Sequence, residues 1–283
     1  MKVVHTIKEV REIVKEWKKE GLSIGFVPTM GYLHEGHKSL ILKSVSQNDR
    51  TVVSDFVNPT QFGPTEDLAR YPRDLERDSK LVESAGADLL FNPEPSEMYP
   101  PHTTTTVNTT EVTEHLCGAR RPVHFGGVCQ VLTKLFNIVT PNRAYFGQKD
   151  AQQLAVVKRF VRDLNFDIEI IGCPIIREDD GLAKSSRNTY LSPEERKAAV
   201  ILSKSLKAGK ALIEAGERSS KKVIDEITKV LNTEPLARID YVSVVDNVNI
   251  QPIDTIKGEV LVAIAVYIGT TREIDNFIIE VND

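Results

Sequence analysis

The chain has 283 residues, of which 41% are hydrophobic and 27% are charged, as expected for a globular protein with one or two domains. Its formal net charge of −4 argues against a nucleic-acid surface, because such surfaces carry a basic excess. No apolar run is long enough to span a bilayer, and no signal core follows the N-terminus. The three cysteines, Cys117, Cys129 and Cys173, form no CxxC pair and are expected to be buried thiols. We therefore expect a soluble cytoplasmic protein without a membrane or nucleic-acid partner.

The first part of the chain alternates between predicted strands and predicted helices. Strands are expected over residues 22–27, 51–57, 87–91, 144–146 and 167–171. Helices are expected between Thr6 and Gly21, through Leu40 to Val45, and over residues 72–85, 128–139 and 151–164. Residues 103–107 are predicted to form a short edge strand. This alternation predicts an α/β fold with a doubly wound, Rossmann-like parallel sheet.

The pattern changes after Arg177. A polar loop over 177–188 precedes two helical stretches, 193–214 and 219–231, and three strands are then expected over residues 239–245, 260–266 and 277–281. Helices followed by consecutive strands predict a smaller α+β domain with an antiparallel sheet. We therefore predict two domains, 1–176 and 177–283.

Two histidines follow the first of these strands, in the stretch from Phe26 to His37. His34 and His37 are expected where the strand ends and a helix begins. A helix N-terminus offers unpaired N–H groups and the positive end of a dipole, and both favour phosphate. Gly31 and Gly36 allow the backbone to bend and a ligand to approach closely. The spacing differs from an HExxH zinc helix and no third ligand lies nearby, so the pattern favours phosphate over a metal.

Three further polar loops lie at or beyond predicted strand ends. Residues 58–62 offer side-chain amides, 147–153 combine a glycine turn with a lysine, and 184–188 offer hydroxyls, an ammonium and a guanidinium. Each loop alone is more typical of a solvated surface than of a binding site. Gathered at one edge of a sheet with the histidine turn, they predict a site for a polyphosphate and a small polar acid.

Several of these segments together resemble one family. The histidine turn reads VPTMGYLHEGH, and FVNPTQF, YPRDLERD, YFGQKDAQQL and REDDGLAKSSRNTYLS follow it in order. They are similar to the motifs of the pantoate–β-alanine ligase family, whose fold is of the HxGH nucleotidylyltransferase type. The resemblance covers most of residues 22–192, and the remainder fits the small second domain of that family.

The resemblance implies an ATP-dependent ligation in two steps. Pantoate attacks the α-phosphate of ATP to give pantoyl adenylate and pyrophosphate, and the amine of β-alanine then displaces AMP to give pantothenate. A carboxylate resists attack by an amine because it is charged and has no leaving group, so adenylation makes it reactive. Such an enzyme chiefly positions the reactants and neutralises charge on phosphorus.

The resemblance also implies roles for individual residues. ATP binding falls to Pro28, Thr29, Met30, His34, His37, Gly147, Lys149, Asp150, Lys184, Ser185, Ser186 and Arg187. Pantoate binding falls to Met30, Asn58, Gln61 and Gln153. His34, His37 and Lys149 are the expected catalytic residues, because they would bind the phosphate oxygens on which charge develops.

Other roles follow from the same resemblance. Mg²⁺ is expected to bridge the β- and γ-phosphates, with Asp78 as the residue that touches it directly or through water. Asp150 either holds a ribose hydroxyl or caps the following helix. Arg121 and His124 belong to a segment that closes one side of the site. Members of the family usually form homodimers, so the resemblance implies a homodimer.

The chain departs from the family pattern at two places. Lys184 precedes the serines where the family usually has methionine, and it either aids phosphate binding or faces solvent. Gly126 replaces a residue that is more often polar or charged, so any contact of that side chain is absent here.

Three other functions remain open from the sequence. Another nucleotidylyltransferase would transfer its nucleotide to a phosphate monoester and ignore β-alanine. An aminoacyl-tRNA synthetase shares similar signatures, but the acidic balance and the lack of an anticodon-binding region argue against it. A non-catalytic nucleotide sensor would bind ATP without pantoate-dependent pyrophosphate exchange.

Overall fold

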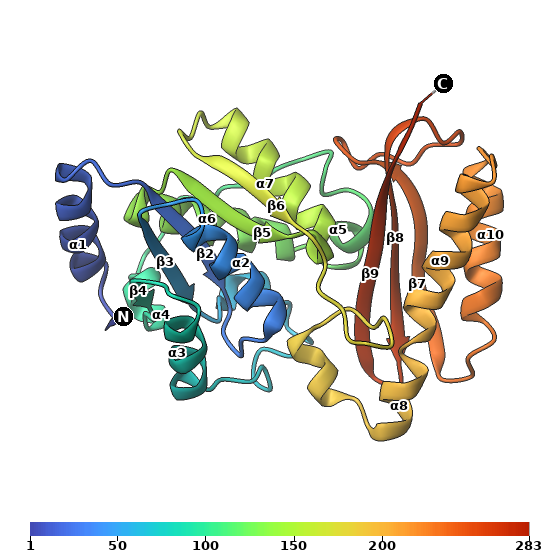
Figure 1. Ribbon diagram of the computed structural model, residues 1–283, viewed down its shortest axis with the longest axis horizontal. Helices are drawn as coiled ribbons and strands as arrows, with labels where there is room; N and C mark the ends of the chain where they lie inside the picture. The colour runs from blue at the N-terminus through green and yellow to red at the C-terminus, as the bar shows by residue number, and fades with distance from the viewer. Residues whose placement is uncertain (283) are drawn as a thin grey trace. The chain divides into compact units, whose positions relative to one another are not determined.

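The computed structural model describes residues 1–282, which form two compact units (Figure 1). The first unit contains Met1–Thr109, Arg121–Gln148 and Val156–Pro174. The second unit contains Thr110–Arg120, Lys149–Ala155 and the chain from Ile175 onwards. The predicted division into domains 1–176 and 177–283 stays a prediction.

A six-stranded parallel sheet forms the centre of the first unit, in the order β1-β4-β3-β2-β5-β6. Its strands are β1 Lys2–Val4, β2 Ile24–Thr29, β3 Arg50–Asp55, β4 Leu89–Phe91, β5 Arg143–Gly147 and β6 Glu169–Cys173. From β2 the chain adds β3 and β4 on one side, and it later adds β5 and β6 on the other side. The predicted doubly wound parallel sheet is therefore confirmed.

Helices cover both faces of this sheet. Neighbouring residues of a strand point to opposite faces, so the side chains of one strand contact helices on both sides. On one face Val27 packs in a buried cluster with Leu40 and Ile41 of α2. On the other face the ring of Phe26 meets that of Phe136 of α6 edge to face, with centroids 6.3 Å apart. The helices of the first unit are α1 Ile7–Lys19, α2 Glu35–Val45, α3 Leu75–Ser84, α4 Pro95–Met98 and α6 His124–Val139, with the 3₁₀ turn η1 Pro59–Gln61. Helix α7 Ala151–Asp163 begins in the second unit and ends in the first.

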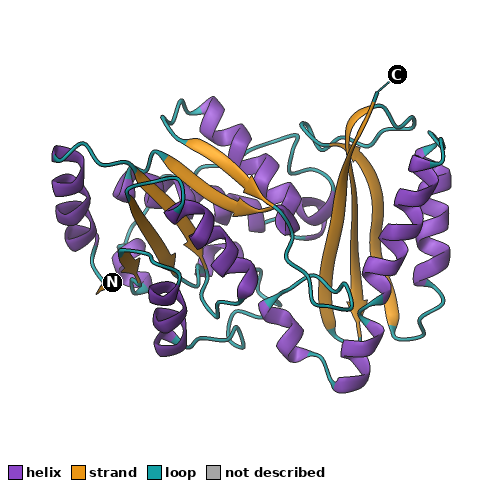
Figure 2. Ribbon diagram, in the orientation of Figure 1, coloured by secondary structure: helices purple, strands orange, loops and turns teal. Residues whose placement is uncertain are grey.

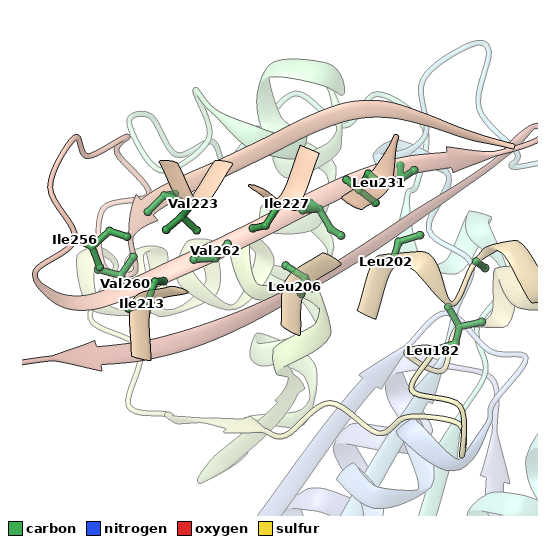
Figure 3. Close-up of a cluster of buried hydrophobic side chains, with 14 of the residues drawn as sticks. Leu182, Leu202, Leu206, Ile213, Val223, Ile227, Leu231, Ile256, Val260 and Val262 are labelled. Atoms are coloured by element: carbon green, nitrogen blue, oxygen red, sulfur yellow. The ribbon is translucent and has the colours of Figure 1, made fainter. Parts of the chain in front are cut away.

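An antiparallel sheet in the order β7-β8-β9 forms the second unit (Figure 2). Its strands are β7 Ala237–Asp246, β8 Gly258–Ile268 and β9 Thr271–Val281. Its helices are α5 Leu116–Arg120, α8 Pro193–Ala198, α9 Ile201–Glu214 and α10 Ser220–Leu231. It also contains the 3₁₀ turn η3 Ser186–Tyr190. A further 3₁₀ turn, η2 Gln148–Asp150, begins with the last residue of a first-unit segment and continues into the second unit. Alternate residues of β8 pack against α9 and α10 in one buried core, which Figure 3 shows. The predicted α+β character of this region is confirmed.

Local signals explain where several elements begin. The Thr6 hydroxyl accepts from the backbone N–H of Glu9, and the Glu9 side chain accepts from the Thr6 backbone, so α1 starts with a capping box as expected. Asp74 caps α3, and the predicted start at Pro72 is wrong because the cap lies two residues beyond the proline.

Three other predicted elements differ from the structure. Residues 103–107 form no strand; the edge of the sheet is instead β1, whose three residues are too few for a visible periodicity. The predicted helix 193–214 is interrupted at Ala199 and Val200, between α8 and α9. Strand β9 starts six residues before the predicted residue 277, because charged side chains interrupt the apolar pattern there.

The other expectations about the whole chain concern membranes and cysteines. No helix within residues 1–282 combines the length and the apolar character that a membrane span requires. Cys117, Cys129 and Cys173 are free and buried, as predicted.

The core of the second unit yields a first prediction. Ile227 on α10 is fully buried in this core, so Ile227→Ala should lower the free energy of unfolding by about 2–5 kcal/mol through loss of contacts and a residual cavity. Urea denaturation followed by circular dichroism measures the change. The control is Val248→Ala, at a side chain that is 60% exposed and should change stability by less than about 0.5 kcal/mol. Equal effects of the two substitutions would contradict this account of the core.

Candidate active site

The strand order reverses between β2 and β5, which pair in parallel: β3 and β4 lie on one side of β2, and β5 and β6 lie on the other. This is the topological switch point of the sheet. Loops at the carboxyl ends of such strands diverge and leave a crevice, which is where open α/β sheets bind ligands. The histidine turn follows β2, and the turn that begins at Gly147 follows β5. Two of the predicted loops thus start at this position.

The backbone of the histidine turn is held by buried carboxyl groups. Asp78 of α3 is fully buried, and its two oxygens accept the backbone N–H groups of Tyr32 and Leu33 at 2.6 and 2.7 Å. Gly31 has a φ of +81°, and a Cβ there would lie 2.2 Å from Oδ1 of Asp55. Only glycine satisfies both the left-handed backbone and this close approach. Asp78 therefore shapes the turn that carries the histidines.

His34 and His37 lie on the first turn of α2 with ring centroids 4.2 Å apart. The backbone N–H of Gly36 donates to Nδ1 of His34 at 3.1 Å, and the backbone N–H of His34 donates to Nδ1 of His37 at 3.3 Å. A ring nitrogen that accepts carries no proton, so the proton of each neutral imidazole is on Nε2. Each ring is thus oriented by the backbone and has its N–H donor at Nε2.

Two carboxyl groups share a buried environment beneath this turn. Burial and then the charge and hydrogen bond of Asp78 raise the pKa of Asp55 to about 7. Burial also raises the pKa of Asp78, although its bonds from Leu33 and Tyr32 act in the opposite direction. Since Asp78 accepts two amide bonds, the proton that the pair shares resides on Asp55, and it does so at pH values below about 7.

A compact amide cluster forms around Gln61 of η1. The Gln61 side chain donates to Sδ of Met30 at 3.0 Å and accepts from Nδ2 of Asn58 at 3.0 Å. Asn58 is 1% exposed, and its amide also donates to the carbonyl of Gly127 while its oxygen accepts from the Tyr99 hydroxyl. The structure therefore brings Met30 and Gln61 together and uses Asn58 as the residue that fixes Gln61.

Helix α6 approaches this cluster closely. A Cβ at Gly127 would lie 2.4 Å from the Thr60 carbonyl oxygen, so the approach requires glycine at this position. His124 is buried, and its Nδ1 donates to the Gln61 carbonyl at 3.1 Å. His124 thus supports the backbone of Gln61.

The remaining residues of this segment are explained by neighbours of the same unit. Arg121 makes a bidentate ion pair with Glu66, with N–O distances of 2.9 and 2.6 Å. Burial raises the pKa of Glu66, but the bonds and charge of Arg121 outweigh it, so that pKa lies below its usual value. A Cβ at Gly126 would lie 2.5 Å from Oδ1 of Asn108. Asn108 therefore occupies the space that a larger residue would need at Gly126.

In the second unit, Lys149 and η3 both lie against β9. The Lys149 carbonyl accepts from the amide of Asn276 on β9 at 2.9 Å. Gln153 is half-buried on the first turn of α7, and Asp150 is exposed in η2. The η3 turn carries Ser186 and Arg187 and packs against β9.

The loop before η3 is anchored at several points. Leu182 is buried in the core of the second unit (Figure 3), and Ala183 makes an isolated antiparallel bridge with Arg177. The hydroxyl of Ser185 accepts from the backbone N–H of Arg187 at 3.2 Å and caps η3. Lys184 pairs with Glu178 at 3.4 Å, so its ammonium already has a carboxylate partner.

Some predicted site residues have other partners in the structure. The Thr29 hydroxyl donates to the Ser54 carbonyl at 2.7 Å and accepts from Gly31, so this side chain stabilises the end of β2. Both oxygens of Asp78 accept backbone amides, as described above. Residues 1–282 contain no group of three His, Cys, Asp or Glu side chains that could hold a metal ion.

Sequence reasoning missed Asp55, Gly127 and Asn276 as supporting residues. Asp55 ends a predicted strand, which is a position that often carries function in parallel sheets. Gly127 lies at the start of a helix, where a glycine is unfavourable unless a close contact requires it. Asn276 interrupts an apolar strand, but nothing local indicates that its partner is the Lys149 carbonyl.

Taken together, the sheet and its loops define the class of protein. A doubly wound sheet carries an HxGH turn at its switch point, and a second α+β unit carries Lys149 and a Ser-Ser-Arg turn. This is the organisation of an α/β nucleotide-binding enzyme of the HxGH type.

Comparison with known proteins identifies the family. The chain matches the family model described as pantoate-beta-alanine ligase over residues 2–278. It is 62% identical over 277 residues to the pantothenate synthetase of Clostridium acetobutylicum, and this match covers 98% of this chain and 99% of the relative. This chain therefore belongs to the pantoate–β-alanine ligase family, and the resemblance of its motifs is confirmed.

Solved structures agree with this assignment. Pantothenate synthetase from Thermus thermophilus superposes with a TM-score of 0.94 at 44% identity, covering 100% of both chains. Pantoate-beta-alanine ligase from Francisella tularensis, described as complexed with beta-gamma ATP and beta-alanine, has a TM-score of 0.80 at 34% identity and covers 98% of this chain and 97% of its own.

The buried carboxyl pair predicts a pH dependence of stability. In the unfolded chain Asp55 titrates near pH 4, whereas in the folded protein its pKa is about 7. The folded state therefore holds the extra proton between these values, and the stability due to Asp55 is full below about pH 4 and is lost as pH rises through 7. Asp55→Asn, whose amide donates to Asp78 at every pH, should remove a decline of up to about 1.4 kcal/mol per pH unit.

Urea denaturation between pH 4 and 8 measures this effect. Asp163→Asn is the matched control, because that carboxyl is exposed. If wild type and Asp55→Asn lose stability with pH at the same rate, the shared proton is absent.

Proposed function

We propose that this chain joins pantoate to β-alanine with ATP, through a pantoyl adenylate, releasing pyrophosphate and then AMP. The observation that carries this proposal is the pair of imidazoles at the switch point, oriented by backbone amides with an N–H donor at each Nε2. The names of the relatives, and the ATP and β-alanine with which the Francisella enzyme is complexed, support the same reaction.

The two histidines suit the first step. When the carboxylate of pantoate attacks the α-phosphate, negative charge grows on the non-bridging oxygens and on the departing pyrophosphate. Donors already in place stabilise that charge without reorganisation. We assign His34 and His37 to the α- and β-phosphates, because both rings stand at the N-terminus of α2, where the helix dipole also favours an anion.

The family motifs assign further phosphate contacts to residues of the second unit. We assign Lys149 to phosphate oxygens, and Ser186 and Arg187 of η3 to the triphosphate. Ser185 caps η3 and so positions that turn, and Lys184 pairs with Glu178. Asp150 is exposed and suits a ribose hydroxyl.

The amide cluster suits pantoate. The amide of Gln61 offers a donor and an acceptor for a hydroxyl and a carboxylate, and Met30 beside it provides an apolar contact for the methyl groups. Gln153 is assigned to the same substrate from the family motif. Asn58 acts indirectly, because both ends of its amide are already bonded to protein groups.

Mg²⁺ is the metal that the family implies. The described residues contain no three-ligand cluster for it, and both Asp78 oxygens accept amides. These residues do not form a dedicated protein cage, which agrees with the preference of Mg²⁺ for substrate phosphates. We assign Mg²⁺ to the β- and γ-phosphates of ATP and give Asp78 the role of supporting the turn.

The setting of the enzyme completes the proposal. We propose a cytoplasmic homodimer that acts on small molecules alone, with neither a membrane nor a nucleic acid as partner. The net charge of −4 and the three free cysteines support this assignment.

Pyrophosphate exchange tests the reaction and the histidines. The enzyme should exchange labelled pyrophosphate into ATP only when pantoate is present, and β-alanine should convert the intermediate to pantothenate and AMP. His34→Ala and His37→Ala should each lower kcat by about 10²–10³, as for the loss of one transition-state donor.

Two results would contradict these assignments. Exchange that does not depend on pantoate would indicate another nucleotidyl transfer or contamination. Full activity of either histidine variant would remove the role given to that ring. The matched control is His5→Ala, at an exposed histidine that bonds the Asn92 carbonyl.

The amide cluster yields a separate prediction. Gln61→Ala should raise KM for pantoate roughly tenfold or more, because a lost hydrogen bond to a charged group costs about 1.5–3 kcal/mol. Asn58→Ala should raise the same constant less, since it only frees Gln61 to move. KM for ATP should stay near the wild-type value in both variants, and steady-state kinetics with each substrate varied in turn measures the difference. An equal rise for ATP would show a general loss of folding.

A further inference from the structure

The histidine turn contains a strained residue to which the proposed reaction gives no role. Gly31 and Tyr32 both have a left-handed backbone, with φ values of +81° and +50°. Glycine adopts this conformation at little cost, but in any other residue the Cβ comes too close to the following carbonyl oxygen. A bulky residue such as tyrosine is an outlier there, and such strain persists only where the surrounding structure holds it. Tyr32 therefore needs support from neighbouring elements.

Helix α3 holds Tyr32 through two successive residues. The carboxylate of Asp78, which is fully buried, accepts the backbone N–H of Tyr32 at 2.6 Å. The guanidinium of Arg77 lies over the Tyr32 ring, with its central carbon 4.5 Å from the ring centroid. A cation at this distance from an aromatic face is attracted by the ring, and a planar guanidinium also stacks on it. The backbone and the side chain of Tyr32 are thus both held by the first turn of α3.

The two contacts from α3 support each other. The side chain of Asp74 caps the helix by accepting the backbone N–H of Arg77 at 3.0 Å, which fixes the residue that carries the guanidinium. Burial raises the pKa of Asp78, whereas its two amide bonds and then the charge of Arg77 lower it. Arg77 therefore favours the ionised carboxylate that accepts the amide of Tyr32.

The chain runs directly from Tyr32 to the proposed catalytic histidines. Leu33 is fully buried and donates its N–H to the other oxygen of Asp78, and His34 is the next residue. The rings of His34 and His37 are oriented by main-chain N–H groups of this same turn. A rotation of the backbone at Tyr32 would therefore displace both rings.

We propose that the Tyr32 ring and the Arg77 guanidinium form a clamp, which holds the strained turn in the conformation that places both imidazoles on the phosphates. This inference rests on the phosphate-binding role proposed for His34 and His37. It makes Tyr32 and Arg77 positioning residues, which act on the reaction through the histidines. Arg77 is exposed and Tyr32 is half-buried, so the clamp secures the turn at the surface while Asp78 secures it from within.

The clamp should affect the rate of the reaction more than the binding of its substrates, because the histidines act on charge that develops in the transition state. Tyr32→Ala removes the ring and keeps the strained backbone, and it should lower kcat roughly tenfold, since small displacements of catalytic groups are costly. Arg77→Met should lower kcat about two- to fivefold, as for the loss of one exposed cation–π contact. KM for ATP and for pantoate should stay within about twofold of the wild-type values.

Two further variants separate positioning from folding. Tyr32→Phe keeps the ring on which the guanidinium stacks and should retain most of the activity. Tyr32→Gly removes the strain together with the ring, so it should be more stable than Tyr32→Ala towards urea and yet no more active. Lys80→Met is the matched control for Arg77→Met, because it removes an exposed cation from the same helix.

Two double-variant cycles locate the effect. Arg77→Met should change kcat little in the Tyr32→Gly background, because the ring that it contacts is already absent. Tyr32→Gly should have a smaller effect in the His34→Ala background than in the wild type, because one of the rings that it positions is already absent. The rate of pantoate-dependent pyrophosphate exchange by the full-length enzyme measures every variant.

The outcomes separate this inference from the proposed function. Wild-type kcat in Tyr32→Ala, recovery of activity in Tyr32→Gly, or full additivity in either cycle overturns the clamp and leaves the ligation itself intact. If the wild type shows no pantoate-dependent exchange, the proposed function fails and this inference fails with it.

Discussion

The histidine turn depends on one buried carboxylate. Asp78 accepts two backbone amides of the turn, and below about pH 7 the neighbouring Asp55 is protonated and adds no second negative charge. Gly31 has a left-handed backbone, and a side chain at this position would collide with Asp55. The imidazoles are then oriented by main-chain N–H groups of the same turn. The orientation of the two imidazoles is therefore set by the hydrogen bonds of the turn.

The second unit shows a different use of charge. Arg177 and Lys184 are paired with the acids Asp275 and Glu178 of their own unit. These pairs hold the polar loop before η3 in place.

Much of the fold follows from short-range patterns. The capping box at Thr6 and the apolar run of β2 involve residues close in sequence, so local preferences determine them. Strand β1 and the start of β9 escape prediction because their pairing partners lie far along the chain or are masked by charged side chains. For the site, motif reasoning predicted roles for His34, His37 and Gln61, and these roles stay predictions. It did not separate residues that support the turn, such as Asp78 and Asn58, from residues assigned to a ligand.

The sequence by itself determined the family, the alternation of strands and helices, and the residue types of the candidate site, because these reside in contiguous motifs. Only the tertiary structure decided which polar groups are already bonded. Asp78 meets Leu33 from 45 residues away, and Asn276 meets Lys149 from 127 residues away. Burial and partner choice are properties of three-dimensional neighbours, so a buried and fully bonded carboxylate such as that of Asp78 looks like any other carboxylate in the sequence.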